Sequence, residues 1–189
     1  MQTIIALDQH LFHFINQGLS AGWLDAVMVG VTSLGRIPLI FFPAWLVLFW
    51  RGGNKGRLTC WLLIPLLLAG DMIPAHVLKP LFARPRPFLA LEGVRLLDSA
   101  PHLLGQYGFP SNHATNIFAL CTFLALVYRE KWLWGFFGAS SVTIAFSRIY
   151  VGVHYPGDVI VGSLFGMILG FLTYLIYKRI RNLRKLDYT

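Results

Sequence analysis

The sequence predicts an all-α integral membrane helix bundle of about five transmembrane helices, with six as the alternative, preceded by an N-terminal interfacial helix. Of its 189 residues, 56% are hydrophobic and only 13% are charged, and the mean hydropathy is +0.62. Soluble domains have about 25% charged residues, and a run of roughly 20 apolar residues is long enough to cross a bilayer. We therefore predict a single membrane-embedded domain over residues 1–189, since the spans leave too little chain for a second one.

The first segment, from about Met1 to Gly22, mixes apolar and polar positions. Ile4 and Leu7 belong to its apolar set, and Asp8 and Asn16 interrupt it. Such a mixture is typical of an amphipathic helix that lies in the membrane interface.

Five apolar stretches follow. The first, about Leu24–Trp50, is longer than a bilayer requires and contains several Gly and Pro residues, so we expect it to kink or to begin with a separate short helix. The other four stretches are Leu58–Leu78, Asn112–Tyr128, Lys131–Phe146 and Asp158–Tyr177.

Basic residues predict the orientation of these spans. One basic block, from Arg51 to Arg57, follows the first span, and another, beginning at Lys178, follows the last. Lys and Arg are enriched on the cytoplasmic side of membrane proteins, so both blocks are expected to be cytoplasmic. This placement also accounts for the net charge of +8, and nucleic acid is not an expected partner.

Three polar clusters remain once these charges are set aside. They run from Lys79 to Pro87, from Pro110 to His113, and from Ser147 to Asp158. With five spans, all three clusters lie on the membrane face opposite to the basic blocks. Polar residues that converge from different spans are what a composite active site requires.

The first cluster suits phosphate binding. Lys79 ends a span, and Arg86 follows on a loop stiffened by three prolines, so the two cations can converge at a small entropic cost. Guanidinium and ammonium groups are good donors to phosphate oxygens. The alternative is that these cations only snorkel toward lipid headgroups, and we assign Arg84 to that role.

The second cluster opens a span. Ser111 is expected to be the N-cap, so that its hydroxyl and the following amides form an anion site at the positive end of the helix. His113 lies in the first turn, where it could protonate a leaving oxygen. The alternative is ordinary helix capping.

The third cluster surrounds the start of the last span. Pro156 suits the first helical position, which puts His154 just before the helix and Asp158 in its first turn. The carboxylate can orient the imidazole and favour its charged form, which leaves the other ring nitrogen to attack phosphorus while Arg148 stabilises the phosphate oxygens. The alternatives are a structural histidine or a metal site, but no further ligands converge here, and neither a metal nor another cofactor is predicted.

Together the three clusters resemble the signature of the type 2 phosphatidic acid phosphatase family. Its first motif, a lysine, six residues and Arg-Pro, is met by Lys79 and Arg86. Its third motif, Ser-Arg, five residues, His, three residues and Asp, is met between Ser147 and Asp158. In its second motif, Pro-Ser-Gly-His, Asn112 replaces the glycine, whose amide commonly helps to bind phosphate in the family.

The resemblance implies metal-independent hydrolysis through a phosphohistidine. It implies His154 as the nucleophile, Asp158 as its partner and His113 as the general acid. It also implies phosphate ligands, namely Lys79, Arg86, Ser111, Asn112 and Arg148. The side chain of Asn112 is expected to influence substrate fit.

We therefore expect a lipid phosphatase, either a phosphoric monoester hydrolase or a lipid pyrophosphatase, in the bacterial cytoplasmic (inner) membrane, with its active site facing the periplasm or cell exterior. Candidate substrates are undecaprenyl pyrophosphate, phosphatidylglycerol phosphate and lipid A 1-phosphate. The alternatives are a lipid phosphotransferase and a non-enzymatic lipid transporter. Its expected partners are the phosphorylated lipid and the bilayer, and no protein partner is required.

Two further features concern packing. Asp71 lies within the second span, where we expect it to tie spans together by hydrogen bonding, although an intramembrane carboxylate also suggested the transporter. Gly162, Gly166 and Gly170 recur at four-residue spacing and predict a close helix contact along the last span.

Overall fold

The structure is a computed structural model that describes residues 2–34, 38–97 and 105–184. Within these ranges the chain is helical and contains no β-strand. The helices are α1 (Gln2–His13), η1 (Phe14–Gly18), α2 (Gly22–Leu34), α3 (Pro38–Arg51), α4 (Gly53–Ile73), η2 (Pro74–Leu78), α5 (Lys79–Phe82), α6 (Pro87–Ala90), α7 (Asn112–Tyr128), α8 (Lys131–Tyr150) and α9 (Pro156–Arg184).

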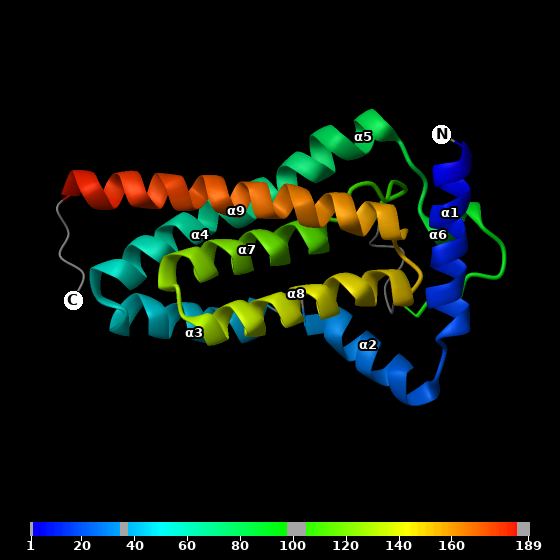
Figure 1. Cartoon of the computed structure of the whole chain (residues 1–189), viewed down its shortest axis with the longest axis horizontal. Coiled ribbons are helices and arrows are strands. Elements are labelled where there is room, and N and C mark those ends of the chain that lie inside the picture. The colour runs from blue at the N-terminus through cyan, green and yellow to red at the C-terminus, as the bar shows by residue number, and fades with distance from the viewer. Residues whose placement is uncertain (1, 35–37, 98–104, 185–189) are drawn as a thin grey trace.

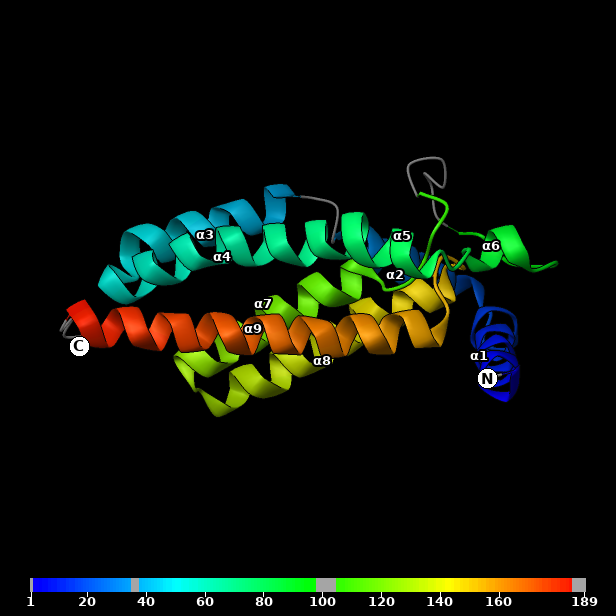
Figure 2. The same cartoon turned by 90° about the horizontal axis from the view of Figure 1, so that it is seen from above.

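Five long helices form an elongated bundle. Helices α3, α4, α7, α8 and α9 lie along its long axis, with α3 and α4 in one layer and α7, α8 and α9 in the other (Figures 1 and 2). Short connections join α3 to α4, α7 to α8 and α8 to α9, so these neighbours run in opposite directions. Helix α1 crosses one end of the bundle at a steep angle (Figure 1).

Helix boundaries follow local sequence signals. Ser111 caps α7 by accepting a hydrogen bond from the Ala114 amide, and Pro156 opens α9, as the sequence predicted. Helix α8 ends before Gly152, which has a φ of 87°, a backbone conformation that glycine adopts without steric cost.

The predicted first span is two helices, α2 and α3, on either side of residues 35–37. Helix α7 has the predicted bounds, whereas α8 and α9 extend beyond theirs. Within the described ranges, two helical stretches are long and apolar enough to cross a membrane, Gly53–Phe82 and Pro156–Leu183, and only 33% of the most apolar part of each is buried. Apolar residues such as Ile160, Phe171 and Ile176 are therefore on the outside of the bundle, where lipid rather than a protein core can cover them.

Helices α7 and α9 pack in close contact along the three glycines. A Cβ atom at Gly162 would lie 2.7 Å from the Ser111 carbonyl oxygen, and one at Gly170 would lie 2.5 Å from that of Ala119. At Gly166 it would collide with the backbone of Thr115. The prediction of close packing from the glycine spacing is confirmed.

Polar side chains fasten the N-terminal segment to the bundle. The Asn16 amide is fully buried and donates to the backbone oxygens of Arg95 (2.9 Å) and Tyr150 (2.7 Å). On the outer side of α1, Ile4 and Leu7 are 73% and 58% exposed. The helix therefore combines an anchored side with the exposed apolar side that an interfacial helix needs.

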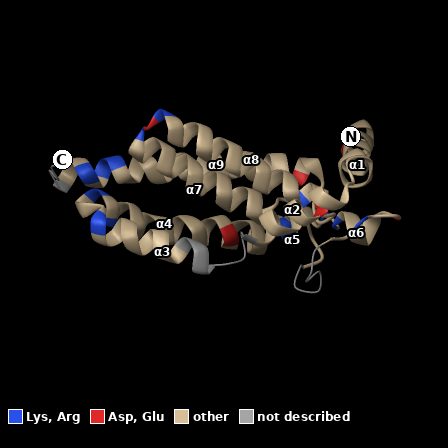
Figure 3. Ribbon diagram, turned by 90° about the horizontal axis from the view of Figure 1, so that it is seen from below, with Lys and Arg blue, Asp and Glu red and all other residues tan. Residues whose placement is uncertain are grey.

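Charge is concentrated at the two ends of the bundle (Figure 3). At the end that bears the C-terminus, basic residues gather in three segments: the turn after α3, the turn after α7 and the last part of α9. The other end, which α1 crosses, carries the three predicted polar clusters. Span counting predicted this separation.

Candidate active site

His154 is held in place by the end of α8. Its backbone amide and that of Val153 both donate to the Arg148 carbonyl oxygen, each at 3.2 Å. The predicted span ended at Phe146, which left Ser147 and Arg148 in the following loop, but both belong to the last turns of α8. This correction matters because a helix end positions the residue that follows it more rigidly than a loop does.

The hydrogen bonds of His154 indicate its tautomer. Arg86 Nη1 lies 3.1 Å from His154 Nε2. Because a guanidinium group can only donate, Nε2 accepts, and the ring proton is on Nδ1. Nδ1 in turn lies 3.4 Å from Asp158 Oδ2, at the long end of hydrogen-bond distances.

Arg86 is itself fixed by backbone acceptors. Its Nε donates to the Gly105 carbonyl oxygen at 2.7 Å, and Nη1 also donates to that of Val153 at 3.0 Å. Only 3% of the residue is exposed. A buried cation with a preset direction suits an anionic substrate group.

The surroundings of His154 favour its neutral form. Burial lowers the pKa of the His154 imidazole well below its ordinary value of 6.5, and the neighbouring cations Arg86, Arg148 and Lys79 lower this pKa further, while a backbone hydrogen bond with Gly108 opposes them. The expectation that Asp158 would favour the charged imidazole is therefore wrong. The neutral form has the lone pair that a nucleophile needs.

The Asp158 carboxylate lies closer to Arg84 than to His154. This fully buried carboxylate accepts from the Tyr155 amide at 3.1 Å and from Arg84 Nη1 at 2.8 Å. The Arg84 guanidinium also lies 4.0 Å from the centre of the Tyr155 ring. Arg84 therefore does not simply snorkel toward headgroups, as the sequence reading had it, because a buried carboxylate of the site directs its side chain.

Asp8 links the N-terminal helix to this site. Its Oδ2 pairs with Arg84 Nη2 at 2.6 Å, and its Oδ1 accepts from the Gly157 amide at 2.7 Å. Sequence reasoning missed this contact because 76 residues separate Asp8 from Arg84. The pattern of α1, which indicated an interfacial helix, contained no signal for it.

The second cluster lies at the start of α7. Ser111 is fully buried, and its backbone amide donates to the Asp158 carbonyl oxygen at 3.0 Å, which joins the starts of α7 and α9. His113 follows in the first turn with its Nε2 buried. Asn112 directs its side-chain amide to Asp71 of α4 and donates to Oδ1 at 2.7 Å. This bond confirms that Asp71 ties two spans together.

The other two predicted cations, Lys79 and Arg148, belong to different helices. Lys79 is the first residue of α5 and is close enough to lower the pKa of His154. Arg148 is fully buried on α8 and donates to the Thr32 hydroxyl of α2, a contact that the sequence did not suggest. The site therefore surrounds one neutral imidazole with cations from three segments.

The backbone of Gly108 closes another side of the site. A Cβ atom there would lie 2.9 Å from Asp158 Oδ2 and 3.6 Å from His154 Nδ1. The close approach therefore requires glycine. Among the described residues, no three His, Cys, Asp or Glu side chains gather as a metal site would require.

Several known proteins are similar to this chain in sequence. The family model described as PAP2 superfamily matches residues 58–182. The undecaprenyl-diphosphatase of Sulfolobus acidocaldarius is 32% identical over 170 residues, which are 89% of this chain and 78% of that protein. The lipid A 4'-phosphatase of Bacteroides thetaiotaomicron is 43% identical over 72 residues, which are 38% of this chain and only 32% of that protein.

The fold also matches a solved structure. The crystal structure of LpxE from Aquifex aeolicus superposes with a TM-score of 0.73 at 29% sequence identity. The match covers 88% of this chain and 94% of that one. The likeness therefore extends over most of this chain.

Proposed function

Because this chain belongs to the PAP2 superfamily, we propose that it is a membrane lipid phosphatase that works through a phosphohistidine at the non-cytoplasmic membrane face. The reaction is hydrolysis of a phosphate or pyrophosphate headgroup and uses no metal. The observation that carries the proposal is the pair of contacts on His154, in which Arg86 meets Nε2 and Asp158 faces Nδ1.

In the first step, His154 Nε2 attacks phosphorus, and a P–N bond forms as the P–O bond to the lipid breaks. Arg86 exchanges its hydrogen bond to Nε2 for one to a phosphate oxygen, and Lys79 and Arg148 stabilise the charge on the other oxygens. Asp158 holds the Nδ1 proton, so the ring stays aligned during attack. His113 gives its proton to the departing oxygen.

In the second step, water replaces the histidine. The neutral His113 takes a proton from the attacking water, a new P–O bond forms, and the P–N bond breaks. Inorganic phosphate leaves, and His154 returns to its neutral form. The Ser111 hydroxyl and the amide of Asn112 contribute donors at the helix start, where a phosphate is favoured.

The substrate is a lipid whose headgroup enters the polar end of the bundle while its chains stay in the bilayer. Exposed apolar residues on α1 and α9 support this placement because they border the polar end. The candidates are undecaprenyl pyrophosphate, phosphatidylglycerol phosphate and lipid A 1-phosphate. The undecaprenyl-diphosphatase relative supports the first candidate, and the lipid A 4'-phosphatase relative is named for a different phosphate of lipid A. We further propose five spans and a site that faces the periplasm or cell exterior.

The test is phosphate release by the purified protein from each of the three lipids, with and without chelator. We expect release that chelator does not reduce. His154→Ala should lower kcat by at least about a thousandfold without unfolding the protein. His76→Ala is the matched control, because this histidine is exposed and, among the described residues, its ring Nδ1 lies 3.1 Å from the Met72 carbonyl oxygen one turn earlier.

A second measurement identifies the intermediate. Lipid with a radioactive headgroup phosphate should label the protein during turnover, and the label should survive alkali but not acid, as a P–N bond does. His154→Ala should remain unlabelled. Retained turnover in that variant, or lipid flux without phosphate release, would overturn the proposal.

A further inference from the structure

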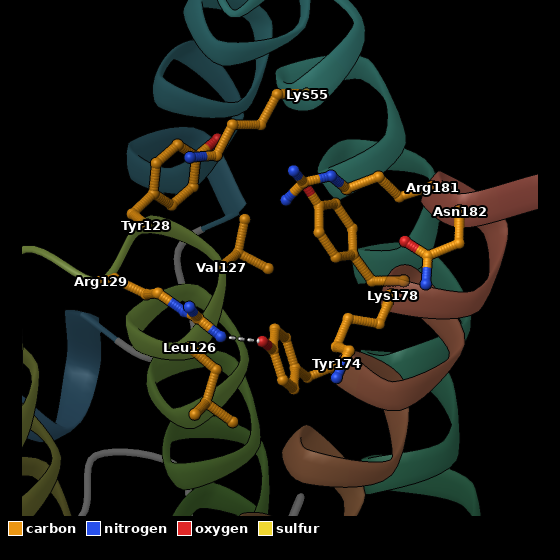
Figure 4. Close-up of a pocket in the computed structure, with 10 residues that line it drawn as sticks. Lys55, Leu126, Val127, Tyr128, Arg129, Tyr174, Lys178, Arg181 and Asn182 are labelled. Carbon is orange, nitrogen blue, oxygen red and sulfur yellow. Dashed lines mark hydrogen bonds between the residues drawn. The ribbon is translucent and has the colours of Figure 1, made fainter. Parts of the chain in front are cut away.

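A basic cavity lies at the end of the bundle opposite to the candidate active site. It has a volume of about 450 Å³ and lies between α4, the end of α7 and α9 (Figure 4). Its cations are Lys55, Arg129, Lys178 and Arg181. Among the ten described residues that line it, none carries a carboxylate.

Aromatic rings hold two of these cations at the cavity wall. Lys55 Nζ lies 4.5 Å from the centre of the Tyr128 ring, and Arg129 donates to the Tyr174 hydroxyl at 2.6 Å. Figure 4 shows Arg129 and Arg181 extending from α7 and α9 into the space between these helices. A ring or hydroxyl orients a cation without neutralising its charge. The four like charges repel one another, the nearby Glu130 carboxylate offsets part of this repulsion at Lys55, and a bound anion would relieve more of it.

An apolar groove adjoins this cavity. It has a volume of about 470 Å³, and its walls come from α3, the end of α7 and the start of α8. Its lining residues are Ala44, Val47, Leu48, Leu124, Tyr128, Leu133 and Phe137. Tyr128 lines both the groove and the basic cavity, so the two meet at this side chain.

We propose that this end of the protein binds an anionic phospholipid, with its phosphate headgroup in the basic cavity and an acyl chain in the apolar groove. Basic residues that only determine the orientation of spans in the membrane need not gather around one cavity. The four cations of this cavity do so, and an apolar groove lies beside them. Basic pockets between transmembrane helices on the cytoplasmic side are suited to phospholipid headgroups. The site is separate from the His154 site, so its failure would leave the proposed reaction untouched.

The test is lipid binding to the purified full chain in detergent, counted by native mass spectrometry. We expect dioleoylphosphatidylglycerol to bind about tenfold or more tightly than dioleoylphosphatidylcholine. The double variant Lys55→Gln and Lys178→Gln should lose most of this preference. The matched control, Arg57→Gln and Lys131→Gln, removes the same charge from exposed residues outside the cavity and should keep the preference.

Two further binding measurements distinguish a whole phospholipid from inorganic phosphate as the ligand. Inorganic phosphate at millimolar concentration should fail to displace the lipid, and phosphatidylglycerol with six-carbon chains should bind more weakly because it fills less of the groove. Equal binding of the two dioleoyl lipids by the unaltered protein would overturn the proposal without reference to any variant. Displacement by inorganic phosphate would overturn it as well, since the site would then recognise phosphate alone.

Discussion

At the scale of single residues, burial and then the neighbouring cations lower the pKa of His154 and favour its neutral form. A carboxylate partner normally raises the pKa of an imidazole. Here the carboxylate of Asp158 is shared with Arg84, while Arg86 donates directly to the ring. The charge of Asp158 therefore stabilises Arg84 as well as the ring, and the balance favours the neutral nucleophile.

This balance predicts how activity depends on pH. The pKa of the His154 imidazole in the folded protein lies well below its ordinary value of 6.5. The ring therefore stays neutral, and kcat/KM is maintained, until the pH falls to that lowered pKa. Arg148→Gln removes a cation that lowers this pKa, so the acid limb of the pH profile should move to higher pH. Arg148→Lys keeps the charge, and its acid limb should stay where it is in the unaltered protein. An unmoved limb in Arg148→Gln would contradict the electrostatic account.

Asp8 and Arg84 act as positioning residues through Asp158. Asp8→Asn weakens the pair that directs Arg84, so we expect kcat to fall about 10- to 100-fold with a smaller change in KM. Arg84→Gln should have a similar effect, and Arg84→Lys should restore part of the rate.

Asp25→Asn is the control for this prediction. It breaks an ion pair of similar length, the one with Arg95 at 2.7 Å, and disturbs the hydrogen bond from the Tyr150 hydroxyl, and neither contact involves a predicted site residue. An equal loss of kcat in Asp25→Asn and Asp8→Asn, accompanied by equal losses of thermal stability, would show that Asp8 only holds the fold together.

At the scale of elements, the packing of α7 against α9 positions the site, because Ser111 and Asp158 lie at the starts of these helices. Gly170→Leu would push a side chain into the backbone near Ala119, which lies 2.5 Å from an added Cβ. We expect a loss of about 3 kcal/mol of stability, measured as a lower Tm in detergent.

Gly138→Leu is the matched control. It makes the same substitution in α8, where nothing lies within 4 Å of an added Cβ. Its Tm should remain close to that of the unaltered protein. If both variants lost the same stability, leucine itself rather than the helix contact would be responsible.

At the scale of the whole molecule, the two charged ends make the orientation testable. Both native cysteines, Cys60 and Cys121, are buried and should not react with an impermeant maleimide in intact cells. Glu92→Cys, at an exposed position beyond α6, should be labelled in intact cells. Lys131→Cys, at the other end, should be labelled only after permeabilisation. The reverse pattern would place the site on the cytoplasmic side.

The sequence by itself determined the all-helical fold, the bounds of α7 and the grouping of the three polar clusters at one end. These features depend on local properties, namely hydropathy, helix caps and the alternation of span direction. Motif spacing was also enough to predict His154 and Arg86 as site residues. In the structure, Arg86 Nη1 lies 3.1 Å from His154 Nε2.

Only the tertiary structure decided how the site is supported. The docking of Asp8 on Arg84 and the contact between Arg148 and Thr32 each join segments far apart in the chain. The neutral state of His154 likewise depends on its burial and on cations from several segments. Such effects depend on distances in space, which spacing along the chain does not encode.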